Sequence, residues 1–285
     1  MNKIEIKSYA KINLILNVLS KREDGYHNIE SIMQSISLAD KVTISERING
    51  IKIDCDHHYV PTDLESLAYR TAGKILDECN LKKGINIKIN KKIPLASGLA
   101  GGSTNSATIL TGINKLYHLG LTNDRLREIG GELGMDIPFF VQNGTALAYH
   151  KGEKVTHFES VQPSLWLVIL NPGFEVSTRW AYQNLNFEKN NIKVDRINKM
   201  IIALKTGKPE EIAKNLYNSF EKSVIRKFPE IGKIKETLIN EGALGALMSG
   251  SGPTIFGIAK NKDAALKIYS NIKSKYNLIW VVHTI

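Results

Sequence analysis

A glycine-rich segment of this sequence has the residue types that binding of a phosphate would require. Gly98, Gly101 and Gly102 stand among small residues, immediately before Ser103. Glycines let backbone N–H groups converge without interference from a Cβ atom, and a helix that starts behind them adds partial positive charge. The segment therefore predicts an anion-binding loop, and a flexible turn that happens to precede a helix is the alternative interpretation.

The spacing of these glycines excludes two common nucleotide-binding patterns. No Lys-Ser or Lys-Thr pair follows the last glycine, as a Walker A loop requires, and the Gly-x-Gly-x-x-Gly spacing of a dinucleotide fold is missing. Ser103 and Thr104 fall where a helix cap is expected, and their side-chain oxygens favour a binding loop over a simple turn.

A lysine and an aspartate in separate apolar segments are complementary. Lys11 and Asn13 are two positions apart at the start of an apolar strand pattern, so both side chains point to one face. Asp136 lies in the apolar run Gly134–Phe140, where a charge is costly unless it is paired. Taken singly, Lys11 also fits a surface lysine at a strand end, and Asp136 a helix cap or a turn.

The hydrophobic pattern predicts the elements that position these groups. Period-two alternation predicts an antiparallel sheet within residues 3–58 and a strand over 85–90 that leads directly into the glycines. Spacings of three and four residues predict helices over 64–79, from about Ser103 to before Gly120, and from Thr122 to about Leu133. Strand, glycine loop and helix are therefore consecutive.

The second half of the chain predicts another mixed arrangement of helices and strands. Residues 175–242 are rich in lysine and asparagine and contain several short helical patterns. The remaining predicted elements are strands at 145–149, 165–170, 243–249, 254–259 and 278–284 and a helix near 262–273. We therefore predict an α+β fold with two domains, at residues 1–160 and 161–285.

Composition limits the class of protein without naming it. The chain has 285 residues, 42% of them hydrophobic and 23% charged, which is typical of a protein that folds throughout. The N-terminus alternates polar and apolar residues, so we predict no export signal. The longest apolar stretches, such as Leu165–Leu170, are too short to span a membrane, and we predict a cytoplasmic location because the two cysteines form no disulfide framework. Cys55 and Cys79 form no Cys-x-x-Cys pair, and we expect neither a disulfide framework nor a zinc site.

The formal net charge of +10 indicates that anionic partners are attracted, but it does not identify them. The lysines are scattered along the chain without a dense tract, so a nucleotide-handling enzyme is favoured over nucleic-acid binding. We therefore expect a small-molecule partner, no nucleic acid and no membrane, and we leave the oligomeric state open.

The glycine-rich segment resembles the phosphate loop of the galactokinase, homoserine kinase, mevalonate kinase and phosphomevalonate kinase (GHMP) superfamily. The additional glycines between Leu99 and Ser103 are similar to the loop of the 4-diphosphocytidyl-2-C-methyl-D-erythritol kinases, with Ala100 in place of a glycine. An alanine there requires a permissible backbone angle. Three further motifs resemble those of the superfamily or of this branch: Ala10–Leu14, Gly134–Phe139 and Met248–Phe256.

The resemblance implies a two-lobed fold, with an N-terminal lobe like ribosomal protein S5, a ferredoxin-like C-terminal lobe and the active site between them. It implies that Asp136 is the base that accepts the proton of a substrate hydroxyl, and that Lys11 orients Asp136 and stabilises developing charge. Mg²⁺ would bridge the phosphates, with Ser103 nearest to the metal. The implied ATP-binding residues are Pro94, Leu95, Ala96, Ser97, Gly98, Leu99, Ala100, Gly101, Gly102, Ser103 and Thr104.

The segment Lys21–Ser31 contains the motif that predicts the substrate. Tyr26 offers a flat ring for stacking on a base, and His27 can form hydrogen bonds with the edge of a pyrimidine. A solvated hairpin with an aromatic plug is the alternative. Arg-x-Asp-Gly-Tyr-His is typical of the 4-diphosphocytidyl-2-C-methyl-D-erythritol kinases, and this resemblance implies that Tyr26 and His27 hold cytosine. It also places Tyr182 on the other side of the base and Asn13 near the reacting hydroxyl.

We therefore predict ATP-dependent phosphorylation of the 2-hydroxyl of 4-diphosphocytidyl-2-C-methyl-D-erythritol, a step of isoprenoid precursor synthesis by the non-mevalonate route. A mevalonate-branch or sugar kinase of the same superfamily is an alternative, although such an enzyme does not need the Asp24–His27 motif. An RNA-binding protein is a second alternative, because the fold of the first domain also occurs in nucleic-acid-binding domains.

Overall fold

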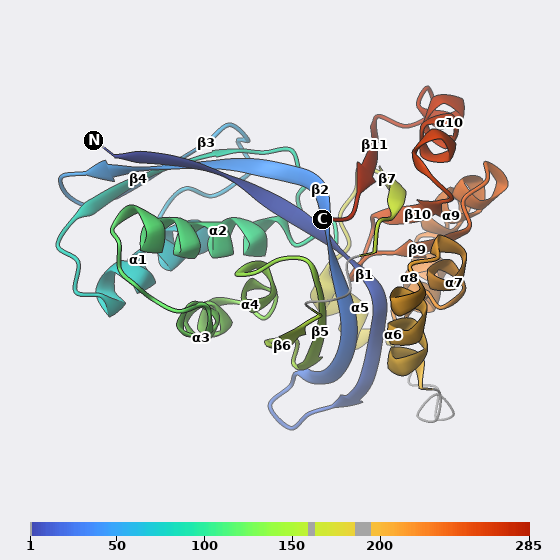
Figure 1. Cartoon of the computed structure of the whole chain (residues 1–285), viewed down its shortest axis with the longest axis horizontal. Helices are drawn as coiled ribbons and strands as arrows, with labels where there is room; N and C mark the ends of the chain where they lie inside the picture. Colours follow the sequence, from blue (N-terminus) through green and yellow to red (C-terminus); the bar gives the residue numbers. More distant parts are fainter. Residues whose placement is uncertain (1, 159–162, 186–194) are drawn as a thin grey trace. The chain divides into compact units, whose positions relative to one another are not determined.

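The computed structural model describes residues 2–158, 163–185 and 195–285 and contains helices and strands in mixed order (Figure 1). The chain forms two compact units, each discontinuous in sequence. The first unit comprises Met1–Ala10, Leu38–Pro94 and Ala100–Asn143, and the second comprises Lys11–Ser37, Leu95–Leu99 and Gly144–Ile285. Two long strands, β1 (Lys3–Lys21) and β2 (His27–Arg47), contribute residues to both units.

The first unit contains a sheet in which β4 (Gly84–Asn90) lies between β2 and β3 (Ile51–Cys55) and pairs with both. The second half of β2 is antiparallel to β4, with Ile44 opposite Ile87, and β3 is parallel to β4. The β-branched residues Ile44, Ile53, Ile85, Ile87 and Ile89 on these strands are buried, as the period-two pattern predicts. The prediction of a purely antiparallel sheet was wrong for β3, because the helical connection between β3 and β4 allows a parallel pair.

Helices cover one side of this sheet (Figure 1). They are α1 (Leu67–Glu78), α2 (Gly101–Leu116), α3 (Asn123–Leu133) and the short α4 (Ile137–Phe140). The side chains of Ser66 and Thr122 accept hydrogen bonds from the first turns of α1 and α3, and α3 follows Thr122 as the predicted helix does. Helix α2 approaches the sheet closely, since a Cβ atom on Gly112 would lie 2.4 Å from Ile44 Cδ1.

The second unit contains a four-stranded antiparallel sheet in the order β11-β7-β10-β9. Along the chain these strands are first β7, then β9, β10 and β11, so the spatial order is fourth, first, third, second, as in a ferredoxin-like sheet. Apolar residues of α8, α9 and α10 pack with β7 and β10 in one buried cluster. The strands and helices are β7 (Trp166–Asn171), α8 (Glu221–Lys227), α9 (Pro229–Asn240), β9 (Gly245–Met248), β10 (Ile255–Ala259), α10 (Lys262–Ile272) and β11 (Leu278–His283).

The parts of β1 and β2 that belong to the second unit pair with further strands of this unit. Strand β5 (Thr145–His150) is antiparallel to β2 and to β6 (Lys154–His157), and the short β8 (Tyr217–Asn218) is parallel to β1. The described residues of this unit also form the helices α5 (Thr178–Gln183), α6 (Arg196–Thr206) and α7 (Pro209–Lys214). The α+β fold predicted from the sequence is confirmed.

Three local findings refine the predictions. Helix α2 begins at Gly101 rather than at Ser103, because Ala100 adopts the left-handed conformation that starts it. Both cysteines are free. Across the described ranges no helix has both the length and the apolar character needed to cross a membrane.

Candidate active site

The first turn of α2 is built to present backbone amides. Its N-cap residue, Ala100, has φ 57° and ψ 36°, and an alanine side chain cannot accept hydrogen bonds from the amides behind it. These amides and the positive end of the helix are therefore suited to an anion. The predicted capping role of Ser103 and Thr104 was wrong, because both lie inside the first turn, where Ser8 Oγ donates to Thr104 Oγ1 at 3.1 Å.

A buried ion pair lies beside this helix start, and it was not predicted from the sequence. Lys91 pairs with Asp40, and both side chains are almost inaccessible to solvent. Asp40 also accepts hydrogen bonds from the backbone amides of Lys92 (2.7 Å) and Ile93 (2.9 Å). A Cβ atom on Gly101 would lie 3.1 Å from Lys91 Nζ, so the ammonium group contacts the beginning of α2. The pair fixes the strand that leads into the glycine-rich segment.

The residues Leu95–Leu99 of that segment contact the Ser-Gly-Ser-Gly turn between β9 and β10. Ser249 Oγ donates to the carbonyl of Gly98 at 3.0 Å, and the amide of Thr254 donates to the carbonyl of Ser97 at 3.3 Å. A Cβ atom on Gly98 would lie only 2.1 Å from the carbonyl oxygen of Ser249. These contacts place the Met248–Phe256 motif against the glycine-rich segment.

We expect Gly98→Ala to reduce kcat/KM at least about a hundredfold and to lower the melting temperature, since the methyl group would overlap backbone and φ is +79°. Steady-state kinetics and thermal unfolding measure the two effects. Gly120→Ala is the matched control, because Gly120 has φ +70° but open space around its Cβ position. Equal effects of the two substitutions would contradict the role of close packing at Gly98.

Lys11 and Asn13 lie on the same face of β1, as predicted. Lys11 Nζ donates to Asn13 Oδ1 at 2.7 Å, and both side chains are buried. Asn13 Oδ1 also accepts the amide hydrogen of Gly250 at 3.0 Å, and its Nδ2 donates to Ser31 Oγ at 2.8 Å. A surface lysine at a strand end is therefore excluded, and Asn13 connects Lys11 to the Ser-Gly-Ser-Gly turn.

Asp136 immediately precedes α4 in the first unit and is half-buried. Its side chain makes no capping hydrogen bond to α4, so the capping aspartate considered above is excluded. The next residue, Ile137, is fully buried and packs against Gly130 of α3, where a Cβ atom would lie 2.6 Å from Ile137 Cγ2. This packing fixes the backbone of Asp136. Lys11 belongs to the second unit, and its pairing with Asp136 stays a prediction.

His27 and Tyr182 stack on each other in the second unit, with ring centroids 4.7 Å apart and planes inclined by 25°. Tyr182 in turn meets the edge of the buried Phe220 at 4.7 Å, so the core holds the ring in place. Partial burial lowers the pKa of His27, and the positive charge of Lys21 acts in the same direction. The neutral imidazole, which can both donate and accept a hydrogen bond, is therefore favoured near neutral pH.

Tyr26, which directly precedes His27 in the sequence, has an exposed ring. Half of the residue's surface is accessible (50%), and Lys151 Nζ lies 5.0 Å from the ring centroid. Gly25 precedes it with φ +82°, a conformation that favours glycine and makes the tight turn between β1 and β2. An exposed aromatic ring on a turn so tightly specified is suited to stacking on a planar ligand.

The comparisons with known sequences agree with this geometry. Residues 66–144 match the family described as GHMP kinases N terminal domain, and residues 200–278 match that described as GHMP kinases C terminal. A 4-diphosphocytidyl-2-C-methyl-D-erythritol kinase of Clostridium botulinum strain Langeland is 40% identical over 279 residues, which cover 98% of this chain and 99% of the relative. The corresponding kinase of Acetivibrio thermocellus is 39% identical over 285 residues and 100% of both chains.

Solved structures show the same relationship. A crystal structure of 4-(cytidine 5'-diphospho)-2C-methyl-D-erythritol kinase is similar with a TM-score of 0.84 and 30% identity, covering 99% of both chains. The homoserine kinase of Cytophaga hutchinsonii has a TM-score of 0.79 at 20% identity, covering 100% of this chain and 95% of that one. The latter similarity concerns the fold alone.

The fold and the sequence matches together define an ATP-dependent small-molecule kinase of the GHMP class, with an N-terminal and a C-terminal domain. Within this class, the chain belongs to the 4-diphosphocytidyl-2-C-methyl-D-erythritol kinase family.

Proposed function

We propose that this protein transfers the γ-phosphoryl group of ATP to the 2-hydroxyl of 4-diphosphocytidyl-2-C-methyl-D-erythritol and releases the 2-phosphate and ADP, in non-mevalonate isoprenoid precursor synthesis. The observation that carries this proposal is the turn between β1 and β2, where Tyr26 is exposed and His27 stacks on Tyr182. Full-length identity of 40% to a kinase named for this substrate supports it.

In the proposed reaction, Asp136 accepts the proton of the 2-hydroxyl as the oxygen attacks the γ-phosphorus. The bond between the γ-phosphorus and the bridging oxygen breaks, and ADP leaves. Lys11, held by Asn13, would orient Asp136 and stabilise the negative charge that develops on the transferred group. The amides at the start of α2 would bind the phosphates of ATP. These residues supply positioning and charge, which dominate catalysis of phosphoryl transfer.

We propose Mg²⁺ as the metal that neutralises the phosphates of ATP. Within the described parts of the chain, no three His, Cys, Asp or Glu side chains gather into a metal-binding cluster. Mg²⁺ keeps several waters and is commonly held by substrate phosphates with one or two protein ligands. Ser103, partly exposed in the first turn of α2, would provide such an oxygen.

For the cytidine group, we propose that the Tyr26 ring stacks on cytosine and that the His27 imidazole forms hydrogen bonds with its edge. Tyr182 would close the other side of the base, since its ring is already ordered by His27 and Phe220. Cytosine has a donor and two acceptors on its edge, which a neutral imidazole can match. Asn13 would lie near the reacting hydroxyl, where its amide nitrogen offers a second donor besides the one bound to Ser31.

A coupled assay of ADP release tests the proposed function. We expect turnover with 4-diphosphocytidyl-2-C-methyl-D-erythritol and none with mevalonate, homoserine or galactose.

Tyr26→Ala should raise KM for the cytidine substrate about tenfold, because stacking of a base on an aromatic ring contributes roughly 1–3 kcal/mol, and should leave KM for ATP unchanged. Tyr269→Ala on α10 is the matched control. Turnover of another alcohol in its place would refute the substrate assignment, and equal losses for both substrates would refute the stacking role.

A further inference from the structure

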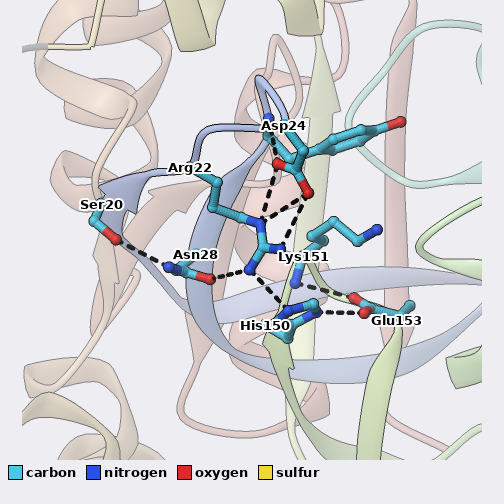
Figure 2. A network of polar contacts seen from close by, with 8 residues as sticks. Ser20, Arg22, Asp24, Asn28, His150, Lys151 and Glu153 are labelled. Atoms are coloured by element: carbon cyan, nitrogen blue, oxygen red, sulfur yellow. Dashed lines mark hydrogen bonds and ion pairs between the residues drawn. The ribbon is translucent and has the colours of Figure 1, made fainter.

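A network of polar side chains connects the turn that carries Tyr26 to the turn between β5 and β6 (Figure 2). Its centre is Arg22, the first residue after β1. The contacts of its guanidinium group extend to three segments: the turn itself, the beginning of β2 and the end of β5. None of the roles assigned above uses this arginine.

The guanidinium group of Arg22 binds one residue that precedes Tyr26 in sequence and one that follows His27. Its Nε lies 3.1 Å from each carboxylate oxygen of Asp24, and its Nη1 donates to Asn28 Oδ1 at 3.0 Å. Asp24 also accepts the amide hydrogen of Tyr26 at 3.1 Å. The pKa of Asp24 is held below its usual value, mainly by the hydrogen bond from Arg22. Tyr26 and His27 of the proposed cytosine site therefore lie in sequence between Asp24 and Asn28, which both bind the guanidinium group of Arg22.

The third contact of Arg22 fixes the tautomer of His150. Nη1 lies 2.8 Å from His150 Nε2, and because a guanidinium group only donates, Nε2 must accept. The proton of the neutral ring is then on Nδ1, which donates to Glu153 Oε1 at 2.5 Å. His150 adopts φ 65°, which costs a non-glycine residue free energy and persists where its surroundings impose it.

Glu153 holds the turn between β5 and β6 to this network. It accepts a hydrogen bond from His150 and another from the amide of Lys151 at 2.9 Å. Burial acts to raise the pKa of Glu153, but these hydrogen bonds outweigh burial and lower it. Lys151, whose amide is fixed in this way, places its ammonium group over the Tyr26 ring. The network therefore connects to the proposed base-stacking ring from two directions.

We propose that Arg22 is a positioning residue for the cytidine group, which holds the Tyr26–His27 turn to β5 before substrate binds. The inference rests on the proposed function. A preorganised turn loses less conformational freedom on binding, so this network contributes to the affinity for the cytidine substrate and not to the transfer step. A lysine cannot replace the arginine, since a single ammonium group cannot reach Asp24, Asn28 and His150 in one plane.

The test compares KM with kcat in the full-length enzyme. We expect Arg22→Lys to raise KM for 4-diphosphocytidyl-2-C-methyl-D-erythritol about tenfold, with kcat and KM for ATP within about twofold. The reason is that hydrogen bonds to a charged group are stronger than those between neutral groups, and the substitution breaks several of them. His150→Asn tests the same link from β5, because asparagine tolerates a left-handed backbone but lacks the second ring nitrogen. We expect about a threefold increase in KM, and no further increase when it is combined with Arg22→Lys.

Two reference variants separate the possible outcomes. Arg125→Lys, in a surface ion pair of α3, should leave all constants unchanged. If Tyr26→Ala raises KM and the Arg22 and His150 variants do not, the positioning role is wrong and the proposed function stands. If Tyr26→Ala itself has no effect, the proposed cytidine site is wrong. A loss of kcat and thermal stability in parallel with KM would show that Arg22 only maintains the fold, and would also overturn the inference.

Discussion

Replacement of Asp136 by asparagine is expected to lower kcat by about 10²- to 10⁴-fold, the contribution of a well-placed general base. Asparagine has the same shape but cannot accept the proton of the substrate hydroxyl. The backbone at this position is fixed by the packing of Ile137 against Gly130, so the fold should be retained. The measurements are single-turnover kinetics with the cytidine substrate and titration with a non-hydrolysable ATP analogue. Nucleotide affinity should stay within about twofold, because the base contacts the alcohol and not ATP.

The control for this substitution is Asp124→Asn, at an exposed aspartate in the first turn of α3. It removes the same charge without approaching the predicted chemistry and should leave kcat unchanged. If Asp136→Asn retains the turnover of the wild type, Asp136 is not the base, and the proposed mechanism fails. A shift of the pH profile without a fall in the maximal rate would likewise assign proton transfer to another group.

Lys11→Met is expected to reduce kcat by about 10²- to 10³-fold, with a smaller change in either KM. Loss of one preorganised group that stabilises charge in a transition state has this magnitude. Methionine has a similar length, and Asn13 Oδ1 keeps its hydrogen bond from the amide of Gly250, so the second unit should fold. A large effect on kcat with little effect on KM would distinguish stabilisation of the transition state from simple binding of substrate.

The matched control is Lys7→Met, at an exposed lysine four positions earlier on β1. It alters net charge by the same amount but has no predicted contact with substrate. Similar kcat values for Lys11→Met and the wild type would contradict the proposed role. An equal loss in both lysine variants would indicate that the activity depends on overall charge and not on the site.

Local chemistry explains why much of the fold and several site residues were predictable from the sequence. Strand β4 and helices α1 and α3 follow from apolar residues at period two or at three- and four-residue spacing, which depend only on backbone geometry. The shared face of Lys11 and Asn13 follows from the same alternation. The turn before Tyr26 contains Asp24 and Gly25, residue types with an intrinsic preference for turns.

Contacts between residues far apart in the chain were decided by the tertiary structure alone. Arg22 meets His150 because β5 pairs with β2 in the register that places Ile29 opposite His150. The start of α2 at Gly101 depends on Ala100 accepting a left-handed conformation that its residue type disfavours.

By itself, the sequence indicated a glycine-rich loop suited to an anion, a lysine and an asparagine on one face of a strand, and an aromatic ring next to a histidine in the segment Lys21–Ser31. Only the tertiary structure decided which residues contact these groups. Ser249 binds the loop at Gly98, and the amide of Gly250 binds Asn13, the partner of Lys11. His150, together with Glu153, binds Arg22 beside the Tyr26 turn. The physical reason is that such contacts arise from strand register and close packing, which bring together side chains that have no signal in the local sequence.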